Sequence, residues 1–247
     1  YYQVTAGIYE TAKQKYIHMK KGAYWEYAKE LKKLTKTPVM AQGGITSLEE
    51  GENILKNKQG DFWGMAQALI ADWLFRFDDW EPFVWRPDII GSRLANWITH
   101  FAFYSADTDA QFREGLFASL ARQSRHLSRS SHLARPGLEA VMAQQGLIYA
   151  GIAVPESDNY LAQGLELLES ETNKQVLPDG GHISRNPHIQ LQMLRALLEI
   201  RDAITAAHID LPNWLKIVIE RMVPMTRALL LGDGTLACFH GGMSGEK

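Results

Sequence analysis

The residues of this chain best suited to chemistry gather in one polar loop, residues 175–188. The loop reads Gln-Val-Leu-Pro-Asp-Gly-Gly-His-Ile-Ser-Arg-Asn-Pro-His and separates two apolar, helix-forming stretches. Such a linker usually needs only a few residues, and long loops on rigid scaffolds often carry sites. His182, Arg185 and His188 converge at the start of the second helix, whose N-terminus adds partial positive charge. Together they could hold a carboxylate, which favours an acidic ligand.

A structural role explains other residues of the same loop. Asp179, Gly180 and Gly181 have the composition of a tight turn, while Asn186 and Pro187 suit the N-cap and first residue of a helix. The sequence therefore leaves two interpretations open, an anion site and a capped, solvated loop.

The elements that must position this loop are amphipathic helices. Ile189, Met193, Leu197 and Ile200, for example, recur at helical spacing after the loop, and strand signals almost vanish after residue 73. Helices are predicted at residues 88–104, 109–129, 137–150, 159–172, 186–206 and 212–231. Successive pairs of such helices indicate stacked helical hairpins.

The first 72 residues follow another pattern. Apolar spacing and the Ser47/Glu50 capping box predict, in order, helix 23–34, strand 37–41, helix 48–56, strand 61–65 and a helix from residue 66. Strands that alternate with helices imply parallel β/α units. Gly43-Gly44 follows the first of these strands, and it is either a plain tight turn or a pair of backbone donors for a phosphate.

Basic residues divide the chain at about the same place. Residues 1–75 contain ten lysines and no arginine, whereas residues 76–247 contain 13 arginines and three lysines. The two residue types have similar helix propensity, so a fold gives little reason for this sorting. We therefore expect two segments of separate ancestry.

Composition excludes several classes of function. The net charge is −2 with the basic residues scattered among acids, which argues against nucleic-acid binding. No run of about 18 apolar residues predicts a membrane span. The single cysteine, Cys238, excludes an internal disulfide and is expected to be buried, and no spacing of cysteines or histidines indicates a metal site. No targeting leader is recognisable at Tyr1, so the location stays unknown.

Four motifs of the longer segment resemble one family. They are residues 175–187, Arg221-Met-Val-Pro-Met-Thr-Arg227, residues 232–239 and Trp85-Arg-Pro-Asp-Ile-Ile-Gly-Ser-Arg-Leu-Ala-Asn-Trp97. Together they are similar to the helical domain of bacterial heparinase II/III family proteins, which implies a bacterial origin. The resemblance implies a mainly α fold, an incomplete α/α toroid of helical hairpins over residues 73–247, with no cofactor.

The same resemblance implies a ligand and roles for the loop. Lyases of this family cleave uronic-acid polysaccharides by β-elimination, which needs a group that neutralises the uronate carboxylate, a base and an acid. By motif position His182 and Asn186 are the catalytic candidates, and Arg185 and His188 would bind substrate. The family's C-terminal β domain, which supplies a catalytic histidine, would follow this chain. We therefore expect an acidic polysaccharide or oligosaccharide as partner, bound without cleavage.

Residues 36–55 and 60–72 resemble the end of an old yellow enzyme-type flavin oxidoreductase barrel. In that family the turns after the last two strands hold the FMN phosphate, which implies Gly43, Gly44, Gly64 and Gln67 here. Gly-Arg of the family is Ala66-Gln67 in this chain, and a full barrel needs eight strands. A TIM-barrel fragment over residues 1–72, joined to the toroid near Asp72 and without bound FMN, is expected.

A third interpretation needs no chemistry. Half-toroids with exposed apolar surfaces could serve as helical interaction modules. The sequence thus offers a lyase-derived glycan binder, a flavoprotein fragment and a non-catalytic module.

Overall fold

The computed structural model describes residues 2–4, 23–36, 39–42, 48–59, 62–64, 66–105, 110–155, 157 and 159–242. The chain is mainly α-helical and packs as two compact units. The first unit comprises Tyr1–Asp79 and Thr99–Ser119, and the second comprises Trp80–Ile98 and Leu120–Lys247. The predicted join near Asp72 concerns ancestry rather than packing, and it stays a prediction.

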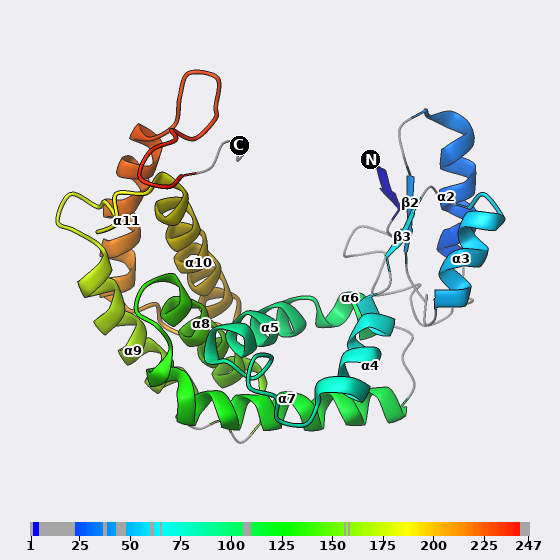
Figure 1. Ribbon diagram of the computed structural model, residues 1–247, viewed down its shortest axis with the longest axis horizontal. Coiled ribbons are helices and arrows are strands. Elements are labelled where there is room, and N and C mark those ends of the chain that lie inside the picture. Colours follow the sequence, from blue (N-terminus) through cyan, green and yellow to red (C-terminus); the bar gives the residue numbers. More distant parts are fainter. Residues whose placement is uncertain are drawn as a thin grey trace. The chain divides into compact units, whose positions relative to one another are not determined.

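A three-stranded parallel sheet begins the first unit. Strands β1 (Tyr2–Val4), β2 (Val39–Gln42) and β3 (Phe62–Gly64) lie in the order β1-β2-β3. Helices α2 (Ala23–Leu34) and α3 (Leu48–Lys56) lie on the same side of the strands in Figure 1. The predicted alternation of helix and strand is confirmed.

The core beneath α2 and α3 is small. Ala28, Val39, Ala41 and Ile54 are buried there, with Trp25 packed against them. The acidic first turn and basic last turn of both helices complement the helix dipole. The charges at the helix ends and the small buried core therefore both stabilise α2 and α3.

The rest of the first unit is helical. It contains α4 (Ala66–Phe77), α6 (Phe101–Ser105) and the first half of α7 (Ala110–Ser130). Phe101 packs against both Tyr104 and Phe117. The predicted single helix 88–104 is wrong, because α5 (Pro87–Thr99) ends and α6 begins on either side of His100.

The second unit is built around α8 (Leu138–Ala153), which is buried on nearly all sides. It packs against α9 (Tyr160–Gln175) and α10 (Pro187–Ala206), and α10 packs against α11 (Asn213–Ala228). Figure 1 shows these helices in green to orange. Ile148, Leu168, Leu197 and Ile200 are completely buried in the shared core. Burying such side chains supplies most of the driving force for this packing.

Two glycines let α5 cross α8 at very short range. A Cβ added to Gly91 would lie 2.1 Å from the Met142 carbonyl oxygen, and one added to Gly146 would lie 2.3 Å from the Gly91 Cα. Real Cβ atoms do not approach so closely. The crossing therefore requires glycine on both helices.

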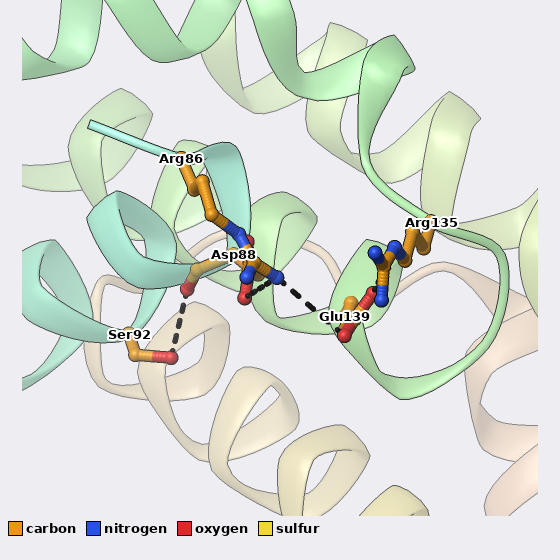
Figure 2. A network of polar contacts seen from close by, with 5 residues as sticks. All are labelled: Arg86, Asp88, Ser92, Arg135 and Glu139. Carbon is orange, nitrogen blue, oxygen red and sulfur yellow. Dashed lines mark hydrogen bonds and ion pairs between the residues drawn. The ribbon is translucent and has the colours of Figure 1, made fainter. Parts of the chain in front are cut away.

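Ion pairs join the starts of the same two helices (Figure 2). Arg86 donates to both carboxylate oxygens of Asp88, at 3.1 and 3.0 Å, and its Nη2 also lies 3.5 Å from Glu139. Ser92 donates to the Asp88 carbonyl, and Arg135 lies 3.9 Å from Glu139. A bidentate pair of this kind fixes geometry as well as charge.

Three further expectations can be compared with the structure. Cys238, expected to be buried, is exposed, so that expectation is wrong. None of the described helices is long and apolar enough to cross a bilayer. In the described ranges, no three His, Cys, Asp or Glu side chains gather as a metal site would require.

Candidate functional site: a hairpin at the start of α10

The polar loop folds as a tight hairpin between α9 and α10. We call residues Val176–His182 the first hairpin, because Val176 and His182 form an antiparallel bridge. Leu177 donates to the Gly181 carbonyl, and Gly180 donates to the Leu177 carbonyl, both at 2.9 Å. Gly180 has φ +81°, so the predicted turn at Asp179-Gly180-Gly181 is confirmed.

The first hairpin lies directly against α11. A Cβ added to Gly180 would lie 2.0 Å from the Arg221 carbonyl oxygen. The position therefore needs glycine for two independent reasons, its backbone conformation and its closeness to the helix.

One buried glutamine holds the hairpin in this place. Gln190 is 1% exposed, and its Oε1 accepts from the His182 backbone N–H at 2.6 Å. Its Nε2 donates to the Gly180 carbonyl and to Thr226 Oγ1, each at 3.0 Å, and lies 3.4 Å from the Met222 carbonyl. A single amide from α10 thus joins the turn and the returning strand of the hairpin to α11.

Asn186 caps α10 as predicted, with Pro187 as the first helical residue. Its Oδ1 accepts from the backbone N–H groups of His188 and Ile189, at 2.8 and 3.3 Å. Its Nδ2 amide makes no hydrogen bond to any of the residues that the structure describes, although Asn186 is only 8% exposed. The cap therefore leaves one strong donor available.

The His182 ring turns inward rather than toward solvent. His182 is 5% exposed, and its Nδ1 accepts from the Ser184 backbone N–H at 3.1 Å. Desolvation lowers the pKa of His182, although the negative charge of Glu171 opposes that shift. Burial thus favours the neutral ring, which carries its proton on Nε2 because Nδ1 accepts, and that buried Nε2 has no acceptor among the described residues.

Arg185 is held by a neighbouring carboxylate. Its φ is +55°, and its Nη1 donates to Asp179 Oδ2 at 2.8 Å. The N–H of Gly181, first, and then the Arg185 guanidinium lower the pKa of Asp179. The pair is exposed, so solvent screens it strongly. Because Arg185 is paired and His182 is neutral, the local positive charge is weaker than the sequence predicts.

A second hairpin, Leu230–Leu236, follows α11, and the chain after it passes Asn186. Leu230 and Leu236 form its antiparallel bridge. A Cβ added to Gly241 would lie 3.4 Å from Asn186 Nδ2, and one added to Gly242 would lie 3.6 Å from Asn186 Oδ1. The chain after the second hairpin therefore borders the free donor of Asn186.

Of the four site residues predicted in the loop, His182 closes the first hairpin, Arg185 lies in the link between the hairpin and α10, Asn186 caps α10 and His188 is in its first turn. His182 and Asn186 are buried, Arg185 is exposed and His188 is partly buried. Their proposed roles stay predictions. Sequence reasoning missed Gln190, which shares a helical stripe with the buried Met193, Leu194 and Leu197. A polar residue in an apolar stripe was the available signal.

Only two of the four residues predicted to contact FMN lie in the described part of the chain. Gly43 and Gly44 lie outside the described residues. Gly64 ends β3 and Gln67 is in the first turn of α4. Their contribution to a phosphate site stays a prediction.

Comparison with known sequences covers the second unit and the end of the first. The sequence model described as Heparinase II/III N-terminus matches residues 70–247. FtsZ-localized protein C of Caulobacter vibrioides is 33% identical over 178 residues, which is 72% of this chain and 31% of that protein. A heparin-sulfate lyase of Bacteroides stercoris is 25% identical over 170 residues, 64% of this chain and 24% of the lyase.

Solved structures show the same fold. The heparan sulfate lyase HepC of Pedobacter heparinus matches with a TM-score of 0.55 at 17% identity, over 87% of this chain and 32% of that one. A heparinase III structure matches with a TM-score of 0.56 at 13% identity, over the same shares of the two chains. The chain thus spans about a third or less of the proteins that it matches.

Proposed function

The chain belongs to the heparinase II/III family, whose N-terminal domain it carries over residues 70–247, and we propose that this domain supplies the helical part of a binding site for uronate-containing glycans. The observation that carries the proposal is the Nδ2 amide of Asn186, which has no hydrogen-bond partner in the described part of the chain and is held at the start of α10 by its own cap. A carboxylate that accepts from this amide would also meet the positive end of the helix.

The helix pairs fit the architecture that the family resemblance implies. Helices α8 and α9 pack together, and so do α10 and α11. We propose that these pairs are successive turns of an incomplete α/α toroid. Each hairpin would then follow one helix of a pair and lie at a common edge.

The residues of the site can do part of the chemistry of β-elimination. Asn186 would hydrogen-bond the uronate carboxylate and make the neighbouring C5 proton more acidic. Arg185 would offer a second, exposed contact, in competition with Asp179. Buried His182 would support the site from beneath, since its Nδ1 accepts from the Ser184 N–H and its Nε2 does not reach solvent. The base and the acid would come from elsewhere in the whole protein.

An Asn186→Asp variant tests the proposal while it keeps the cap. Aspartate caps helices as well as asparagine does, but it replaces the Nδ2 donor with a negatively charged oxygen. Binding of heparan sulfate oligosaccharides, measured by isothermal titration calorimetry, should weaken at least tenfold, as loss of a hydrogen bond to a charged group implies. Ultraviolet absorbance of unsaturated uronate would reveal any cleavage.

A matched control is available at another helix start. Asn159 precedes α9 and makes no side-chain cap hydrogen bond, so Asn159→Asp adds the same charge away from the first hairpin. Unchanged binding in that variant would exclude a general charge effect. Equal affinity of Asn186→Asp and the parent chain, or no binding by the parent chain, would contradict the proposal.

A second candidate function follows from the relative with the higher identity. The protein that is 33% identical to this chain is named for its localisation with FtsZ. Residues 70–247 would then be a non-catalytic helical module at the sites where FtsZ assembles. Co-sedimentation of the chain with purified FtsZ polymers, without cleavage of heparan sulfate, would favour this candidate over the first.

The flavoprotein-like interpretation concerns residues 1–72 alone. Its support is the parallel order of β1, β2 and β3, which a run of β/α units produces. We propose that this segment derives from such a barrel, and we expect no FMN to stay bound on purification. A flavin absorption spectrum from the purified chain would contradict that expectation.

A further inference from the structure

We propose that Gln190 is the positioning residue of the site: its side-chain amide fixes the first hairpin on α11 and thereby sets where His182 and the neighbouring Asn186 lie. The inference rests on the proposed function for its ligand, but its structural part can be tested without any ligand. Gln190 itself is too deeply buried to touch a glycan. It acts only through the residues that it holds.

The bonds of Gln190 satisfy groups on two different segments. The Gly180 carbonyl, at the end of the turn, and the His182 N–H, on the returning strand, belong to the hairpin, and Thr226 Oγ1 is on α11. Only one orientation of the amide supplies an acceptor to His182 and a donor to Gly180. An apolar replacement would leave both hairpin groups without a partner in a buried place, which is costly.

Val176 in the shared core and the Ile183 N–H on the Gln175 carbonyl anchor the hairpin to α9, but no other described hydrogen bond joins it to α10 or α11. Within the hairpin, the bonds between Leu177 and Gly181 and between Gly180 and Leu177 fix its shape but not its position. The close approach of Gly180 to Arg221 prevents the hairpin from moving inward but does not hold it there. Gln190 therefore determines whether the hairpin stays packed against α11.

The position of the hairpin also determines the solvent exposure of the His182 ring, and with it the pKa of the imidazole. The ring is dry only while the hairpin stays on α10 and α11, and Glu171 on α9 is the charged group that opposes its desolvation. If the hairpin detaches, water reaches the imidazole and its pKa rises toward the ordinary value. A direct readout on His182 therefore reports positioning rather than stability.

The test compares Gln190→Met with Gln145→Met in the full chain. Methionine nearly preserves volume and removes the amide. Gln145 is also a buried glutamine of the second unit, but it donates to Glu199 rather than to the hairpin. Nuclear magnetic resonance of the histidine rings, with the His182 signal identified by its loss in His182→Gln, gives the tautomer and pKa in each variant.

In Gln190→Met we expect mixed tautomers, a raised pKa of His182 and roughly tenfold weaker binding of heparan sulfate oligosaccharides. In Gln145→Met the His182 signals should be unchanged. Gln190→Glu should restore part of the parent behaviour, because a carboxylate still accepts from the His182 N–H. An unaltered His182 tautomer and pKa in a folded Gln190→Met would overturn the proposal.

Two further outcomes are separable. If Gln190→Met does not fold, Thr226→Val can take its place, because it removes only one acceptor of the Gln190 amide. The His182 signals should then shift in the same direction as expected for Gln190→Met, but by less. No shift would overturn the proposal. If the parent chain binds no heparan sulfate, the proposed function fails, whereas the resonance measurements still decide the role of Gln190.

Discussion

The first and second hairpins share a backbone and differ in chemistry. Both follow the end of a 16-residue helix, and both carry Asp-Gly with the glycine at φ near +80°. In both, the aspartate Oδ1 accepts from the N–H two residues later, at 2.9 Å. The closing residue is His182 in the first hairpin and Leu236 in the second, and both side chains are buried.

Their surroundings differ as well. The first hairpin touches α11 at Gly180, whereas a Cβ on Gly234 would meet nothing within 4 Å. The comparison indicates that Asp-Gly sets the turn, while packing and the closing residue set what the turn can do. The first hairpin is packed against a helix and forms part of the candidate site, whereas the second has open space around its turn glycine.

The largest expected effect tests the contact between the first hairpin and α11. Gly180→Ala should lower the free energy of unfolding by about 3 kcal/mol, because it adds a clash with the Arg221 carbonyl to the strain of a left-handed residue. Gly234→Ala should cost only about 1 kcal/mol, the strain alone. Urea unfolding monitored by circular dichroism measures both. Equal losses would mean that contact with α11 does not distinguish the hairpins.

The closing residues give a smaller, asymmetric effect. Leu236→His should cost about 2 kcal/mol, because it buries an imidazole without a prepared partner. His182→Leu should stay within about 1 kcal/mol of the parent, since it removes the buried Nε2–H that lacks an acceptor among the described residues. Thermal and urea unfolding check the pair. A His182→Leu variant that is the less stable of the two would contradict this account.

The smallest expected effect is a pH dependence confined to the first hairpin. Desolvation lowers the pKa of His182 in the folded chain, so the unfolded chain binds more protons as pH falls below about 6.5, the ordinary histidine value. Its contribution to stability is full above that pH and is lost on acidification. Stability should therefore fall less between pH 7 and 5 in His182→Leu than in the parent chain. Parallel curves would show that His182 is not the group responsible.

Local signals predicted the elements well. Helices 23–34 and 48–56 have the predicted bounds, and α10 begins with the predicted cap at Asn186 and Pro187. Capping residues and apolar spacing act within a few residues, so they can be read from the chain. The break at His100 could not be, because apolar residues continue through it. It coincides with the passage from one packed unit to the other at residues 98–99.

The sequence indicated which residues belong to the candidate site, but not how they are arranged in space. The loop composition indicated His182, Arg185, Asn186 and His188, yet not that Arg185 adopts a positive φ and meets Asp179. Nor could it indicate that His182 turns inward, since the hairpin that carries it packs at Gly180 against α11, which follows much later in the chain. Long-range packing decides both features.

The exposure of Cys238 has a practical consequence. It is the single cysteine of the chain, and it lies two residues after the second hairpin, just before the Gly241–Gly242 segment that borders Asn186. A thiol-reactive fluorophore or spin label would therefore attach at one defined position without any mutation. Such a label would report the arrival of a glycan, or of a protein partner, through its emission or mobility.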